Sequence, residues 1–70
     1  MIPLVYASPG EENVIRRIGG SPEVRRHLEN LGFTPGGTVT LISVLGGNII
    51  VKVKESRIAL DKAMAGKVMI

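Results

Sequence analysis

Residues 38–53, TVTLISVLGGNIIVKV, decide the fold of this 70-residue chain. Two segments rich in β-branched residues flank a Gly46-Gly47 pair, and glycine pairs of this kind are typical of hairpin turns. After the turn, apolar and polar side chains alternate with a period of two, which indicates a strand with one buried face. The pattern predicts a β-hairpin whose strands are Thr38–Val44 and Ile49–Lys54.

The first strand of this hairpin contains a change of phase. Val39 and Leu41 take the inward phase, but beyond them Ser43 takes it, while Ile42 and Val44 take the outward phase. Either a β-bulge reverses the two faces at this point, or both faces of the hairpin are apolar. The residues alone leave both alternatives open.

Glycine and proline divide the rest of the chain into short apolar segments, spaced about 8–12 residues apart, as in small all-β sandwiches and barrels. Closure into a barrel removes exposed strand edges, so we expect a mainly β barrel of five to six strands rather than an open sheet. Asp61 predicts an N-cap for a short helical turn at about 61–65. Further strands are predicted at Pro3–Tyr6, Asn13–Ile18, Arg57–Leu60 and Lys67–Ile70.

One helix, at about 22–31, interrupts the strands. Ser21 is a favourable N-cap, and Pro22 suits the first helical position because its missing N–H would be unpaired there in any case. Gly32 is placed to end the helix. One apolar stripe at helical spacing is formed by Val24, Leu28 and Leu31.

Composition limits both the architecture and the partners. Seventy residues predict a single domain, 1–70, and without cysteine neither disulfides nor thiolate zinc sites are possible. The net charge of +3 is scattered, and supports only mild attraction to anionic surfaces. Single-strand nucleic-acid binders stack bases on aromatic side chains, and Tyr6 and Phe33 are the only aromatics available. Nucleic-acid binding is therefore a demoted alternative.

Catalytic and metal-binding patterns find almost no support. The single histidine, His27, borders the apolar stripe of the helix, and we expect it to be a half-buried packing residue. Glu11 and Glu12 are adjacent in a turn, so their side chains diverge. We predict no enzyme activity, no resident metal and no cofactor. The N-terminus lacks the pattern of a signal peptide, and no apolar run is long enough to span a bilayer, so we expect a cytoplasmic protein.

A protein-binding surface is the better physical interpretation. If the hairpin keeps its phase, the outward face carries three apolar side chains with a fourth at the tip, and contiguous apolar patches mark interaction sites. Phe33 is a fifth apolar residue, in a predicted loop. The competing interpretation is that a bulge turns Ile42 and Val44 inward and that Phe33 plugs the barrel end. The hairpin residues concerned are Ile42, Val44, Leu45 and Ile50.

Several motifs together resemble those of the FeoA family, ferrous iron transport protein A. They are Pro9-Gly10-Glu11, Ile18-Gly19-Gly20, the segment 26–36 with sequence RHLENLGFTPG, and the closing segment from Ser56 onward. The resemblance covers essentially the whole chain and implies an SH3-like β-barrel with an inserted helix. His27, Asp61 and Met64 depart from the family's usual residues, which leaves the charges of a docking face open. The same barrel resembles the C-terminal domain of iron-dependent repressors, but no helix-turn-helix precedes it here.

The resemblance also implies a function. FeoA proteins are thought to assist a membrane GTPase-permease, ferrous iron transport protein B, from the cytoplasmic side. We therefore expect a non-enzymatic accessory protein of ferrous iron uptake that binds and modulates this permease, and that associates with the membrane only through it. Within the motif, Arg25, Arg26 and Phe33 are the expected contact residues, in addition to the hairpin residues. The alternative is a small basic β-barrel that binds nucleic acid.

Overall fold

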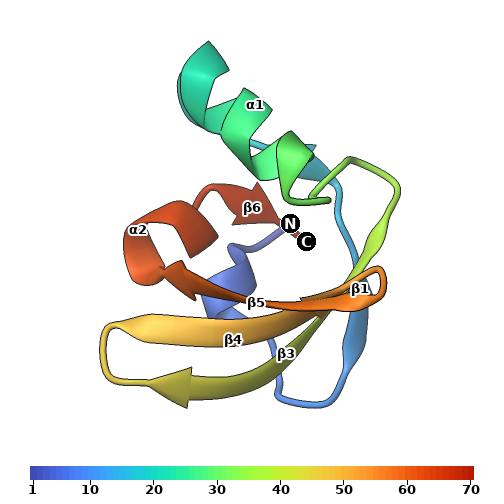
Figure 1. Ribbon diagram of the computed structural model, residues 1–70. Helices are drawn as coiled ribbons and strands as arrows, with labels where there is room; N and C mark the ends of the chain where they lie inside the picture. The colour runs from blue at the N-terminus through green and yellow to red at the C-terminus, as the bar shows by residue number, and fades with distance from the viewer.

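The computed structural model describes residues 1–70 and is mainly β, with six strands and two α-helices (Figure 1). Strands β1, β3, β4 and β5 form one antiparallel sheet in the order β1-β3-β4-β5, and β2 pairs with β6 in a second. In chain order the elements are η1 (Leu4–Tyr6), β1 (Glu12–Val14), β2 (Arg17–Ile18), α1 (Pro22–Asn30), β3 (Thr38–Leu45), β4 (Asn48–Val53), β5 (Ser56–Asp61), α2 (Lys62–Ala65) and β6 (Val68–Met69).

The predicted hairpin is present as β3 and β4, and it contains a β-bulge. The register runs from Val39 opposite Val53 to Leu41 opposite Val51, then shifts so that Ser43 lies opposite Ile50. Because opposed residues in an antiparallel pair share a face, the extra residue turns Ser43 to the outward side. Without the bulge, the serine hydroxyl would face the core. Of the two alternatives left open by the sequence, the structure therefore contains the bulge.

Two of the predicted strands are wrong in detail. The segment Pro3–Tyr6 is a single 3-10 turn that only touches the sheet through a bridge between Pro3 and Met69. In a strand, Leu4 and Tyr6 would share a face, but Leu4 is completely buried and Tyr6 is 73% exposed, and the turn separates them. The segment Asn13–Ile18 is two strands, because the chain leaves one sheet and joins the other at Ile15 and the residue after it.

Helix α1 begins and ends with the predicted caps. The Ser21 hydroxyl oxygen accepts a hydrogen bond from the Val24 N–H at 3.3 Å. At the other end, Gly32 adopts a φ of +107°, and its N–H donates to the Glu29 carbonyl at 2.9 Å. The Phe33 N–H donates back to the Leu28 carbonyl at 3.0 Å. These two bonds form a Schellman motif, which satisfies carbonyls that the helix end would otherwise leave unpaired.

The short helix α2 follows β5 directly. The Asp61 carboxylate accepts a hydrogen bond from the Met64 N–H at 2.7 Å, as expected of an N-cap. At the same point the Lys62 N–H donates to the Gly47 carbonyl at 3.1 Å, which joins the start of α2 to the turn between β3 and β4. The predicted helical turn at 61–65 is therefore present, and it is packed against the hairpin.

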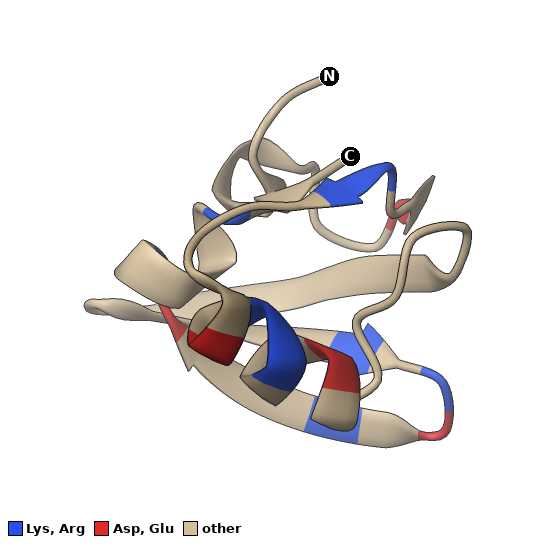
Figure 2. Ribbon diagram, turned by 90° about the horizontal axis from the view of Figure 1, so that it is seen from above, with Lys and Arg blue, Asp and Glu red and all other residues tan.

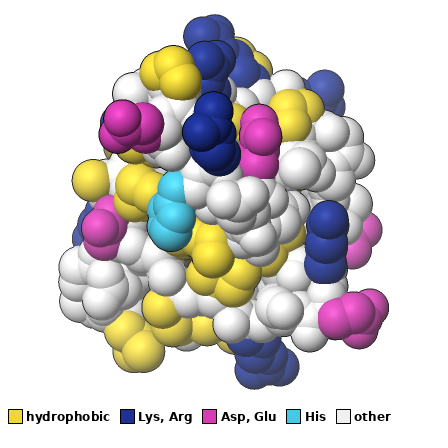
Figure 3. Space-filling view, turned by 45° about the horizontal axis from the view of Figure 1, so that its top comes forward, with side chains coloured by type: hydrophobic (Ala, Val, Ile, Leu, Met, Phe, Trp, Pro, Cys, Tyr) yellow, Lys and Arg dark blue, Asp and Glu magenta, His cyan; other side chains and the backbone are white.

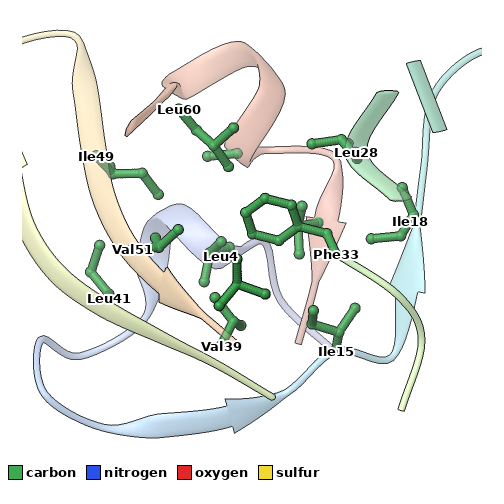
Figure 4. Packing of buried hydrophobic residues seen from close by; sticks show 13 residues of the cluster. Leu4, Ile15, Ile18, Leu28, Phe33, Val39, Leu41, Ile49, Val51 and Leu60 are labelled. Atoms are coloured by element: carbon green, nitrogen blue, oxygen red, sulfur yellow. The ribbon is translucent and has the colours of Figure 1, made fainter. Parts of the chain in front are cut away.

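Thirteen buried side chains form one hydrophobic cluster between the sheets and the helices (Figure 4). Phe33 lies near its centre and is the largest member, and the others are aliphatic. No charged or polar residue is buried. The full set is Leu4, Ile15, Ile18, Leu28, Phe33, Val39, Leu41, Ile49, Val51, Val53, Leu60, Ala65 and Val68.

Candidate functional site

The end of the β3–β4 hairpin exposes two large apolar side chains. Val44 is 48% exposed and Leu45 is 63% exposed. The bulge sets Val44 opposite Ile49, on the side of the sheet that faces the core, but Val44 lies near the end of the hairpin and about half of its side chain stays exposed. Exposed apolar groups at the end of a hairpin are suited to contact with another macromolecule.

The other two hairpin residues of the predicted surface lie elsewhere. Ile50 is on the outward face, where its neighbours across the sheet are Ser43 and Ala59, and it is half-buried. Ile42 is the extra residue at the bulge and is also half-buried. The expectation that these residues share one outward face with Val44 is wrong, because the bulge assigns Val44 and Ile50 to opposite faces.

Phe33 is not available for contact with a partner. Its side chain is completely buried, and its ring points into the core beside Leu28 and Leu4 (Figure 4). The prediction of an exposed loop aromatic is therefore wrong, and Phe33 points inward as part of the core instead. The position after a helix-ending glycine carried the signal, since a Schellman motif usually has a hydrophobic contact at that residue.

Arg25 and Arg26 are exposed on α1. Figure 1 shows α1 at one end of the molecule and the tip of the β3–β4 hairpin at another, with α2 between them. The structure therefore does not bring the two arginines together with Val44 and Leu45 in one patch. Figure 2 shows that the basic residues as a whole are not gathered in one patch. They are distributed over the helix, the sheet and the turns between strands.

His27 is exposed on the surface of α1 (Figure 3). The expectation that it is half-buried is wrong, because the helix presents Leu28 to the core and turns His27 to solvent. No group of three or more His, Asp or Glu side chains is arranged to hold a metal ion.

A pocket of about 310 Å³ on the outward face of the larger sheet was not predicted. It is lined by Glu12, Thr38, Thr40, Lys52, Lys54 and Glu55. Glu12, Thr40 and Lys52 are directly opposite one another on three neighbouring strands, so their side chains form a row. The alternation of Thr38 and Thr40 with buried residues was the signal that this face is polar.

The chemistry of this pocket is hydrogen bonding and charge. Two ammonium groups and two carboxylates surround two hydroxyls, and none of the lining residues is hydrophobic. Small-molecule and cofactor sites are mostly apolar with a few convergent polar groups, which this pocket does not match. We therefore assign it no catalytic or cofactor role.

Comparison with known proteins adds a family. A family model described as the FeoA domain matches residues 2–70. The chain belongs to the FeoA family. It is 30% identical over 70 residues to the protein named "Putative Fe(2+) transport protein A" of Methanocaldococcus jannaschii. The match covers all of this chain and 85% of that protein.

Solved structures of FeoA proteins have the same fold. An iron uptake regulatory protein, FeoA, is 34% identical with a TM-score of 0.87, covering 96% of this chain and 89% of that one. Iron(II) transport protein A from Clostridium thermocellum is 28% identical with a TM-score of 0.90, covering 97% of this chain and 43% of that one. The small SH3-like β-barrel with an inserted helix is thereby confirmed.

The likeness to a repressor domain concerns the fold alone. A manganese-dependent transcriptional repressor has a TM-score of 0.84 at 17% identity, covering 94% of this chain and 38% of that one.

Among the helices of the FeoA-family chain, none has the length and apolar character that crossing a bilayer requires.

Proposed function

We propose that this chain is a non-enzymatic accessory protein of ferrous iron uptake, which binds and modulates ferrous iron transport protein B in the cytoplasm. The observation that carries the proposal is the match of residues 2–70 to the FeoA domain. It is supported by relatives whose names refer to Fe(2+) transport or iron uptake, two of which are matched over 85% and 89% of their own length. In this proposal the chain meets the membrane only through the permease.

The hairpin tip is the proposed centre of contact. Val44 and Leu45 are among the most exposed large apolar residues of the chain, and burying such side chains contributes about 1.5–3 kcal/mol each at full burial. Arg25 and Arg26 on α1 form a second, separate contact, in which guanidinium groups pair with carboxylates of the permease. Ile42 and Ile50 are half-buried, and Ile50 lies on the face opposite to Val44, so in this proposal they are secondary to the tip.

Titration of the labelled chain with the soluble GTPase domain of the permease tests this assignment. We expect amide shifts at β3, β4 and α1. Val44→Ser removes apolar contact at the tip and is expected to weaken binding about tenfold, since a loss of 1.4 kcal/mol corresponds to a factor of ten. The GTPase rate of the domain, measured with and without the chain, reports modulation.

Val14→Ser is the matched control. Val14 is 47% exposed against 48% for Val44, but it lies on β1 rather than at the hairpin tip. Equal weakening by both substitutions would show that the tip has no special part in binding. No shift at any amide with a large excess of the GTPase domain would overturn the proposed function itself.

Nothing in the structure favours the alternative of a nucleic-acid binder. Because Phe33 is buried, Tyr6 is the one aromatic side chain exposed for base stacking. Stacking on several aromatic side chains supplies much of the affinity for single strands.

A further inference from the structure

Strand β5 is an edge strand of the larger sheet and has a strand partner on one side only. It pairs along its full length with β4, from Val53 opposite Ser56 to Asn48 opposite Asp61. Closure of the barrel is therefore incomplete at this edge, contrary to the expectation that closure removes exposed edges. An unpaired edge is a template for another strand.

The backbone of β5 alternates between groups that face β4 and groups that face away. The hydrogen bond from Lys62 N–H to Gly47 C=O continues the β4–β5 register by one step, so Lys62 and Gly47 form a hydrogen-bonded pair. Hydrogen-bonded pairs recur at every second residue of an antiparallel ladder. Leu60, Ile58 and Ser56 therefore bond to β4.

The N–H and C=O groups of Arg57 and Ala59 consequently point away from β4. Neither residue takes part in any backbone hydrogen bond outside the strand ladders. The other strand edges are shorter or covered. β1 has three residues, and β3 extends beyond β1 and the Gly10–Leu41 hydrogen bond only from Ile42 to Leu45. Next to β6, Pro3 forms a bridge with Met69 and Ile2 exchanges two hydrogen bonds with Ile70. The β5 edge is the longest one that no backbone covers.

We propose that this edge binds a second copy of the chain, with the two β5 strands antiparallel and a two-fold axis at Ala59. In this register Ala59 lies opposite its own counterpart. Arg57 lies opposite Asp61 of the second copy, and the symmetry repeats this pair of opposite charges. Opposite charges at directly opposed positions stabilise strand pairs, and a contact that uses the same patch on both copies closes as a dimer.

The side-chain faces agree with this register. Arg57, Ala59 and Asp61 are all exposed and lie on the outward face, so pairing continues that face from one copy to the next. Alanine at the axis leaves room for its counterpart. The Asp61 carboxylate gives one oxygen, Oδ1, to the α2 cap, and its other oxygen can accept from the arginine.

Neighbouring registers fail for identifiable reasons. An axis at Arg57 or at Asp61 would place like charges opposite each other. An axis at Ile58 would set Glu55 against Asp61 of the second copy. An axis between Ile58 and Ala59 would set Arg57 against Leu60, which is 5% exposed and faces the core. Like charges in opposed positions destabilise a strand pair.

Sedimentation equilibrium of the full chain, at concentrations up to about 1 mM, tests the proposal. We expect a monomer–dimer equilibrium. Arg57→Glu places two like-charge pairs across the axis and is expected to weaken dimerisation about tenfold or more. Ala59→Pro is expected to abolish pairing, because proline has no N–H to donate to the second copy. The fold should survive the substitution, because this N–H faces away from β4 and proline is tolerated at the free edge of a strand.

Arg25→Glu is the matched control, since it changes the net charge equally but lies on α1. Hydrogen exchange on the unmodified chain adds a direct measurement: the Arg57 and Ala59 amides are expected to become more protected as concentration rises. The proposal is overturned if the unmodified chain stays monomeric, or if Arg57→Glu and Arg25→Glu dimerise alike. It is also overturned if the dimer forms without added protection at Arg57 and Ala59, which would indicate another interface.

Discussion

The backbone N–H of Phe33 donates to the carbonyl of Leu28 at 3.0 Å, and the two side chains lie together in the core. Both side chains are completely buried. The helix end and the centre of the core are therefore fixed by the same short segment. Gly32, between them in the chain, makes this possible because its φ of +107° turns the backbone sharply after the helix.

Gly32→Ala is expected to destabilise the fold by about 1–3 kcal/mol, because a side chain strains a backbone with this φ. Denaturation in urea measures the loss. Gly47→Ala is the control, since Gly47 has no positive φ and open space around the added atom. A similar loss at both positions would contradict the role assigned to the helix end.

Phe33→Ala is expected to cost about 3–5 kcal/mol, as for other buried aromatic residues. A loss of this size is a large part of the stability of a small domain. Phe33→Leu retains most of the apolar volume and should cost clearly less. If Phe33→Ala instead left the urea midpoint unchanged and weakened only partner binding, the buried position would be wrong.

Substitutions on opposite sides of α1 should separate packing from surface roles. Leu28→Ala opens a cavity under the helix and is expected to cost about 2–5 kcal/mol. Arg25→Ala, on the exposed side, should stay within about 0.5 kcal/mol of the unmodified chain. Thermal unfolding followed by circular dichroism measures both. A severe loss at Arg25 would refute its assignment to the surface.

The N-cap of α2 can be tested at Asp61. Asp61→Ala removes the acceptor for the Met64 N–H and is expected to cost about 0.5–2 kcal/mol, whereas Asp61→Ser keeps a capping oxygen and should cost less. Urea denaturation of the two variants, with Lys62→Ala as a neighbouring surface control, measures the difference. Equal losses for the alanine and serine variants would show that the cap contributes little.

Local signals predicted most of the fold. The caps at Ser21 and Asp61 and the period of two in β4 each depend on neighbours in the chain, and each is found where expected. The single turn at Leu4 and the break at Ile15 and Arg16 were missed because they depend on which sheet the chain joins. That choice is made by contacts between segments far apart in the sequence, which local alternation does not record.

The candidate surface was predicted less well. Val44 and Leu45 are exposed, but the bulge puts Val44 on the core-facing side of the sheet rather than on the predicted outward face, and the position of Phe33 depended on how the segment after α1 enters the core. The sequence around a single apolar residue in a loop has no periodic pattern, so it does not indicate whether the side chain points outward or inward. The polar row at Glu12, Thr40 and Lys52 was also missed, because it exists only once three strands are in register.

The extra residue at Ile42 has a consequence for how this hairpin can change. Before this residue, pairs such as Leu41 with Val51 face the core. After it, the alternation of side chains is shifted by one residue, so that Val44 pairs with Ile49 on that side. The bulge therefore separates two parts of the strand whose inward and outward alternation of side chains differs by one residue. Substitutions in the tip need not follow the alternation of side chains that packs the core. The surface of the tip can therefore change while the packing of the barrel stays the same.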